Sequence, residues 1–219
     1  MEKSFLQTGM DKNVPYFGVI MEKHDPTVYP KYELPQGFYF AEYERGFEKK
    51  WAVLNSDVGH TDSPEDGEKI FIREYMGYDI DTIRKKTIFI MDEKDNLAGV
   101  GSVWDGDDFG ETFQRLHWIA VSSNYQNKGL SKVIVSRALD IYNNLGYRGY
   151  IYLTSQTWSY KALNVYSHFG FVPYMGEKPK NWNEDGSNNP ELDFQTKNKK
   201  AWDIVNEKLN LYKNQKHEK

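Results

Sequence analysis

Residues 116–174, LHWIAVSSNYQNKGLSKVIVSRALDIYNNLGYRGYIYLTSQTWSYKALNVYSHFGFVPY, decide the fold that we expect for this chain. Their apolar spacing predicts, in order, a strand, a glycine-containing turn, an amphipathic helix, a second strand, a second helix and a closing strand. Gly146 is typical of the end of the first helix. Strands that alternate with helices indicate an α/β (α+β) domain, with helices on both faces of a mixed sheet.

The turn before the first of these helices, Gln126-Asn127-Lys128-Gly129-Leu130-Ser131, is a candidate binding site. Backbone N–H groups at a helix start have no partner within the helix and point outward, so they can receive a phosphate. Gly129 lets the backbone approach such a ligand closely, because it has no side chain. The turn therefore predicts a phosphate-bearing cofactor, although a single glycine is also compatible with an ordinary helix start.

The flanking residues resemble the GNAT superfamily of N-acetyltransferases, of the bacterial small-molecule type. The pyrophosphate loop of that family follows Gln/Arg-x-x-Gly-x-Gly/Ala, and the resemblance places Gln126, Gly129 and Ser131 on its three positions. The strand at 116–121 is similar to the fourth strand of the family, with its Ala-Val ending. The later family pattern Ala-x3-Tyr-x3-Gly-Phe is matched by Ala162, Tyr166, Gly170 and Phe171.

This resemblance implies the GNAT fold, in which the fourth and fifth strands splay apart and leave a slot for the pantetheine arm. It implies acetyl-CoA as co-substrate and no metal. The implied cofactor-binding residues are Ile119, Ala120, Val121, Gln126, Asn127, Lys128, Gly129, Leu130, Ser131, Ser159 and Ala162. Ser131 replaces the usual Gly or Ala, and Ser159 replaces an Asn that commonly reaches the pantetheine arm. Lys128 either adds positive charge near the diphosphate or is a solvated loop lysine.

Acetyl transfer to an amine needs an acid for the leaving thiolate, and Tyr166 is the candidate. A phenol with an ordinary pKa of ~10 stays protonated at neutral pH and can donate to a thiolate. The resemblance implies this role at the position of Tyr166. The alternative is a tyrosine that packs beneath the cofactor. A backbone N–H near Ala120 and Val121 is implied as the donor to the oxyanion.

His117 is the candidate base for the acceptor amine. Strand alternation places it on the same face as Arg115 and Ile119. An ordinary histidine pKa of ~6.5 suits removal of an ammonium proton. The Leu-His-x-x-Ala-Val arrangement looks like that of arylalkylamine acetyltransferases, where a strand histidine helps relay the proton. The alternative is a histidine bonded to a neighbour, and Glu111 and Asp105 are reserve candidates.

Composition limits the class of protein. A hydrophobic share of 39% is enough for a core in a chain of 219 residues, and a net charge of −4 argues against nucleic acid as a partner. The absence of cysteine excludes disulfides and a cysteine nucleophile. No run approaches the ~20 apolar residues that span a bilayer. We therefore expect a soluble cytoplasmic protein without a membrane partner.

The sequence as a whole predicts a chain of three segments. They are an N-terminal extension that packs on the domain (1–36), the acetyltransferase domain (37–175), and a loop with a C-terminal amphipathic helix (176–219). Within the domain we expect a first strand at 38–43 and a hairpin at 87–91 and 97–104. We also expect a helix at 45–57 and another that starts with Ser63 as its cap and Pro64 at its first position. The helix at 196–215 carries a stripe of apolar residues that either packs on the domain or forms a dimer contact. The stripe consists of Trp202, Val205, Leu209 and Tyr212.

These observations favour an N-acetyltransferase that transfers an acetyl group from acetyl-CoA to a primary amine of a small molecule. Direct attack in a ternary complex is expected, because no cysteine is present to carry an acyl group. Two alternatives stay open at this point: acetylation of a protein or peptide, and a CoA-binding module without turnover. The sequence is compatible with a monomer or a homodimer.

Overall fold

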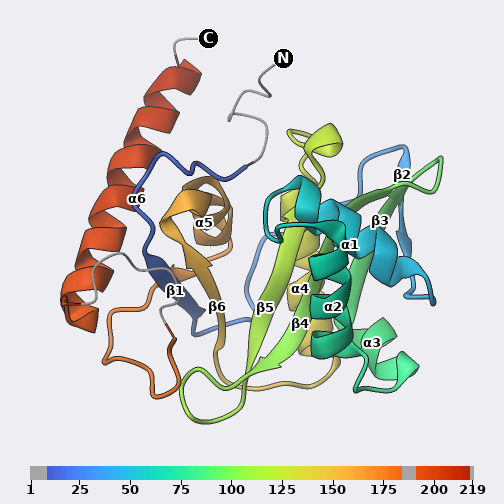
Figure 1. Cartoon of the computed structure of the whole chain (residues 1–219), viewed down its shortest axis with the longest axis horizontal. Helices are drawn as coiled ribbons and strands as arrows, with labels where there is room; N and C mark the ends of the chain where they lie inside the picture. Colours follow the sequence, from blue (N-terminus) through green and yellow to red (C-terminus); the bar gives the residue numbers. More distant parts are fainter. Residues whose placement is uncertain (1–8, 184–190, 218–219) are drawn as a thin grey trace.

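The computed structural model describes residues 9–183 and 191–217, and one seven-stranded sheet organises them (Figure 1). The strand order is β2-β3-β4-β5-β6-β1-β7. The strands are β1 (Gly18–Lys23), β2 (Phe38–Ala41), β3 (Thr87–Asp92), β4 (Leu97–Gly106), β5 (Phe113–Val121), β6 (Ile151–Gln156) and β7 (Val172–Pro173). The helices are α1 (Phe47–Asp57), α2 (Pro64–Tyr75), α3 (Ile80–Lys86), α4 (Leu130–Asn144), α5 (Tyr160–His168) and α6 (Phe194–His217). The mixed α/β fold that we expected is therefore confirmed.

Helices cover both faces of the sheet. On one face, α1 and α2 pack on β4 and β5 through an aromatic cluster that contains Trp51, Phe71 and Tyr75. On the other face, α4 packs behind the same strands, and α5 and α6 continue this layer over β6 and β1 (Figure 1). Trp51 and Tyr75 are only 2% and 1% exposed, so both serve the core rather than a pocket.

Helix α2 begins with the side-chain cap that the sequence predicts. The Ser63 hydroxyl accepts a hydrogen bond from the Asp66 backbone N–H at 3.1 Å, and Pro64 occupies the first helical position. The cap satisfies one of the N–H groups that the helix itself leaves unpaired.

We expect Ser63→Ala to lower the free energy of unfolding by about 1 kcal/mol, because one N–H at the start of α2 loses its acceptor. Urea denaturation measures the change. Ser63→Asn should keep the wild-type stability, since asparagine caps equally well and its amide can also donate to the Asp66 carboxylate, as the Ser63 hydroxyl does. Equal stability of all three proteins would show that the cap contributes nothing.

A β-bulge interrupts β5 beside the candidate base. Ser102 of β4 pairs with His117, but Val100 pairs with Ala120, so two residues of β5 oppose one of β4. Trp118 takes a left-handed conformation there, with φ +49°. Trp118 packs in the cluster beneath α1 and α2, whereas Ile119 packs on the α4 side. The expectation that His117 and Ile119 share a face is therefore wrong, because strict alternation does not survive a bulge.

Strands β5 and β6 separate as the splayed pair that we expected. They are parallel and pair only at Arg115 with Tyr152 and Leu116 with Leu153. Beyond these residues β5 continues to Val121 and β6 continues to Gln156, but the two strands no longer pair with each other and diverge (Figure 1). One edge of residues 117–121 thus faces a gap in the sheet.

Strand β1 was not predicted, although its residues belong to an apolar run. It lies between β6 and β7 and runs antiparallel to both. Val19 and Met21 point into the core and are 1% and 0% exposed. The N-terminal segment therefore supplies an internal strand of the sheet, next to the edge strand β7 of only two residues. The sequence analysis also left out α3.

Helix α6 packs on the domain through its predicted stripe. Trp202 and Val205 are buried in the core beside α5 and β1, and Leu209 and Tyr212 are partly buried against it. The expected loop at 177–192 is described only as far as residue 183 and again from residue 191. In the described ranges, no helix combines the length and apolar character that crossing a membrane requires.

Candidate functional site

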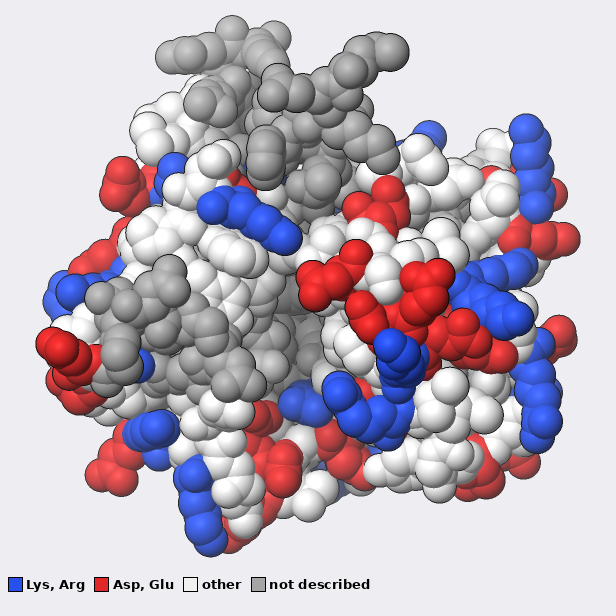
Figure 2. Space-filling model, in the orientation of Figure 1, with Lys and Arg blue, Asp and Glu red and all other residues white. Residues whose placement is uncertain are grey.

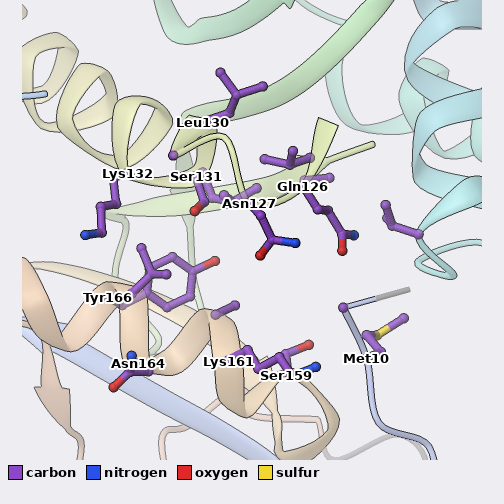
Figure 3. Close-up of a pocket in the computed structure, with 18 of the residues that line it drawn as sticks. Met10, Gln126, Asn127, Leu130, Ser131, Lys132, Ser159, Lys161, Asn164 and Tyr166 are labelled. Atoms are coloured by element: carbon purple, nitrogen blue, oxygen red, sulfur yellow. The ribbon is translucent and has the colours of Figure 1, made fainter. Parts of the chain in front are cut away.

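A cavity of about 470 Å³ lies between the turn before α4, the end of β5 and helix α5 (Figure 3). It brings together most of the residues that the sequence singled out. These are Ile119, Ala120, Val121, Gln126, Asn127, Gly129, Leu130, Ser131, Ser159, Ala162 and Tyr166. Neither Lys128 nor His117 is among the described residues of the lining. Lys128 is exposed, as its alternative interpretation of a solvated lysine requires.

The N-terminus of α4 forms one wall of this cavity. Gly129 is its N-cap residue, with φ +81°, and provides no side-chain hydrogen bond to the first turn. The backbone N–H groups of this turn therefore keep their capacity for an outside acceptor. Asn127 also has a left-handed backbone, with φ +64°. In Figure 3 the side chains of Gln126 and Asn127 point from the turn into the cavity.

The opposite wall is α5, where Tyr166 is 7% exposed. Burial raises the pKa of Tyr166 well above the ordinary value, so the phenol keeps its proton throughout the neutral range. Its hydroxyl points into the cavity toward the turn before α4 (Figure 3). This hydroxyl has no hydrogen-bond partner among the residues that the structure describes. An unpaired phenol donor thus faces the cavity interior.

His117 lies on the other face of the sheet, against α2. Its Nε2 is 3.3 Å from Glu74 Oε2. Burial lowers the pKa of His117 to about 4, although the hydrogen bond to Glu74 acts in the opposite direction. That same hydrogen bond is the main cause that lowers the pKa of Glu74 to about 2. Both directions fit a neutral imidazole whose Nε2–H donates to an ionised carboxylate.

The two reserve candidates for the base, Asp105 and Glu111, both lie away from the cavity. The carboxylate of Asp105 accepts hydrogen bonds from Lys86 at 2.9 Å and from Gln114 at 2.7 Å. Glu111 is exposed in the turn before β5. Neither is among the described residues of the cavity lining.

The sequence matches the acetyltransferase (GNAT) family over residues 32–171, which is more than half of its 219 residues. The chain belongs to the GNAT acetyltransferase family. The matched range of this GNAT protein includes the whole of β5, α4 and α5, and it leaves out β1 and α6.

Solved structures agree with this assignment at the level of the fold. A GCN5-related N-acetyltransferase from Sphaerobacter thermophilus is 14% identical, with a TM-score of 0.54 over 74% of this chain and 50% of that chain. A tandem GNAT protein from the clavulanic acid biosynthesis pathway is 14% identical, with a TM-score of 0.53 over 75% of this chain and 52% of that chain. This GNAT protein therefore spans about half the length of these solved chains. The comparison with curated proteins found no match.

Several lining residues of this GNAT protein were not found by the sequence analysis. Val58 and His60 come from the connection between α1 and α2, and Met10 comes from the N-terminal segment. The remaining ones are Gly9, Tyr125, Lys132, Lys161, Asn164, Val165, His168 and Tyr212. The sequence did contain a signal for the lining residues of α5, because Lys161, Asn164 and His168 recur at helical spacing and therefore share one face of the helix.

Proposed function

We propose that this GNAT protein transfers an acetyl group from acetyl-CoA to the primary amine of a small molecule, by direct attack in a ternary complex. One observation carries the proposal. A single cavity joins the uncapped N-terminus of α4, the strand edge at Ile119–Val121 and the hydroxyl of Tyr166. Anion binding, thioester positioning and proton donation would then take place in one continuous space.

The cavity walls suit the parts of acetyl-CoA, which would supply the thioester carbonyl that the amine attacks. In this proposal the N–H groups at the start of α4 bind the diphosphate, because they are unpaired and lie at the positive end of the helix dipole. Lys132 and Lys161 line the same cavity and add positive charge. The unpaired edge of Ile119–Val121 offers backbone groups to the amides of the pantetheine arm.

In our proposal Ser159 does not take the place of the asparagine that commonly contacts the pantetheine arm. Its side chain accepts a hydrogen bond from Gln156 Nε2 at 3.1 Å, and the residue is 8% exposed. Asn164 also lines the cavity from α5. Its amide offers both donors and an acceptor, so in our proposal Asn164 supplies polar contacts along this wall.

We place the acceptor on the face of the sheet that carries His117 and is covered by α1 and α2, and this acceptor side is enclosed in a way that supports a small acceptor. The N-terminal segment crosses the end of β6, where Asp11 N–H donates to the Trp158 carbonyl at 2.9 Å and Trp158 Nε1 donates to the Val14 carbonyl at 2.8 Å. The turn at 107–110 is fastened to the segment after β7, because Asn181 N–H donates to the Asp108 carbonyl at 2.8 Å. Figure 2 shows the hollow that remains between the α1–α2 side and the β6 side.

A second cavity of about 240 Å³ extends along the acceptor side of β6. It is lined by Tyr16, Gly18, Asp108, Thr154, Ser155, Gln156, Trp182 and Asn183. Thr154 follows the last residue of β6 that pairs with β5, and His117 follows the last residue of β5 that pairs with β6. In parallel strands such residues share a face, so His117 and this cavity lie on the acceptor side. Its size supports an amine of small-molecule dimensions.

A screen of primary amines with acetyl-CoA tests the function, with free thiol release as the readout. We expect release that requires both acetyl-CoA and a small amine. Release that occurs only with a protein N-terminus or a lysine peptide would replace the small-molecule acceptor by a protein. Tight CoA binding without release for any acceptor would contradict catalysis altogether.

A further inference from the structure

We propose that His60, in the connection between α1 and α2, is the catalytic base that takes the proton from the acceptor amine. The inference rests on the proposed acetyl transfer and assigns one of its steps. It differs from the prediction for His117, and the experiment below separates the two histidines.

The position of His60 is the first argument. It lines the same cavity as Tyr166 and Ala120, whereas His117 is not among the described lining residues. Its ring centroid lies 6.0 Å from that of Trp118, the bulge residue next to the exposed edge of β5. His60 therefore enters this cavity from the α1–α2 side, beside the bulge of β5, and we place the acceptor amine on that side.

The hydrogen bonds of His60 fix which of its ring nitrogens is basic. Asn55 is fully buried, and its Nδ2 donates to the Trp51 carbonyl at 3.0 Å. Asn55 Oδ1 is therefore the atom that faces His60 Nδ1, at 2.9 Å, and an amide oxygen can only accept. His60 Nδ1 must then carry the hydrogen, which leaves the lone pair on Nε2. Among the described residues, Nε2 has no hydrogen-bond partner.

The backbone holds His60 in this orientation. Its N–H donates to the Asn55 carbonyl at 2.8 Å, so residue 55 binds both the ring and the main chain of His60. A base that is fixed in this way loses little conformational freedom when it meets the amine, which favours proton transfer. His117 is also held in place, because its Nε2–H donates to Glu74, but it is not among the described residues that line the cavity.

The charge state of His60 leaves its Nε2 lone pair available. Burial alone lowers the pKa of His60 to about 4, and burial also lowers that of His117 to about 4, so both imidazoles are neutral at pH 7 and their positions distinguish them. The acids nearest to His60 in sequence are directed elsewhere. The carboxylate of Asp57 accepts hydrogen bonds from the N–H and hydroxyl of Ser123, both at 2.9 Å, and Asp62 is exposed. Its other neighbours, Asn55 and Trp118, carry no charge.

The proposed step balances as follows. The lone pair of the neutral amine forms a C–N bond with the thioester carbonyl carbon, and the proton leaving nitrogen passes to His60 Nε2. The C–S bond breaks, and the departing sulfur takes the proton of the Tyr166 hydroxyl. His60 then releases its proton to water, and Tyr166 regains one, before the next turnover.

The test compares three histidine variants in the full chain with acetyl-CoA and an accepted amine. His60→Asn should lower kcat/KM for the amine by about 10²-fold or more, because general-base assistance of that size is lost. His117→Asn should cause a smaller loss. His24→Asn is the matched control, since His24 is exposed and pairs with Glu22; it should keep the wild-type rate.

Two further measurements distinguish the loss of a catalytic base from a structural effect of the substitution. Calorimetry should show unchanged CoA affinity for His60→Asn, which demonstrates a folded cofactor site. The rate of His60→Ala should recover with added imidazole, in proportion to its unprotonated form. A near wild-type rate for His60→Asn, or a larger loss for His117→Asn, would overturn the assignment while the proposed function stands. Absence of thiol release in the wild-type protein would instead remove the function itself.

Discussion

Tyr166→Phe lowers the rate of thiol release at saturating substrates by about 10²-fold or more, because the leaving thiolate loses its proton donor. Stability should stay unchanged, since the hydroxyl has no hydrogen-bond partner among the described residues and the ring keeps its packing on Phe171. CoA affinity should also be nearly unchanged. Single-turnover kinetics at neutral pH measures the chemical step directly.

Tyr160→Phe is the matched control for this variant. Tyr160 lies on the same helix and is 8% exposed, but it is not among the described lining residues of the cavity. It should retain the wild-type rate. If Tyr166→Phe also retains that rate, Tyr166 only packs beneath the cofactor and the acid must come from elsewhere.

Gly129→Val removes CoA binding from the detectable range of calorimetry. Gly129 has φ +81°, a conformation that a β-branched residue adopts only with strain. A Cβ there meets no atom within 4 Å, so the valine projects into the open cavity, where we expect the diphosphate. The turn must then either change its conformation or lose access to the ligand. In both cases the backbone N–H groups of the turn can no longer bind the diphosphate.

Gly146→Val separates ligand binding from backbone strain. Gly146 follows the other end of α4 with φ +75°, and a Cβ there also meets no atom within 4 Å. We expect both variants to lose about 1–3 kcal/mol of stability. Gly146→Val should nevertheless bind CoA with wild-type affinity. Unchanged affinity in Gly129→Val would remove the turn from the cofactor site.

The sequence predicted the elements that depend on local pattern. The strand, turn and helix around Gly129 follow from apolar periodicity and one glycine, and the structure confirms their order. The helix cap at Ser63 and the apolar stripe of α6 are confirmed for the same reason, because each depends on residues within a few turns of one helix.

Features that depend on distant contacts could not be predicted in this way. The bulge at Trp118 reverses the faces of the residues after His117, and no residue in the strand signals it. The place of β1 between β6 and β7 depends on which edge of the sheet is left unpaired. His60 looks like an ordinary loop histidine in the sequence, since its place in the cavity beside Trp118 depends on the packing of α1 against β5.

A structure determined with bound CoA is the most direct test of the cofactor site. Our account predicts the diphosphate on the N–H groups at Gly129–Ser131, the pantetheine arm along Ile119–Val121, and the sulfur within hydrogen-bond distance of the Tyr166 hydroxyl. A CoA molecule bound elsewhere, or one whose sulfur lies far from Tyr166, would contradict the account.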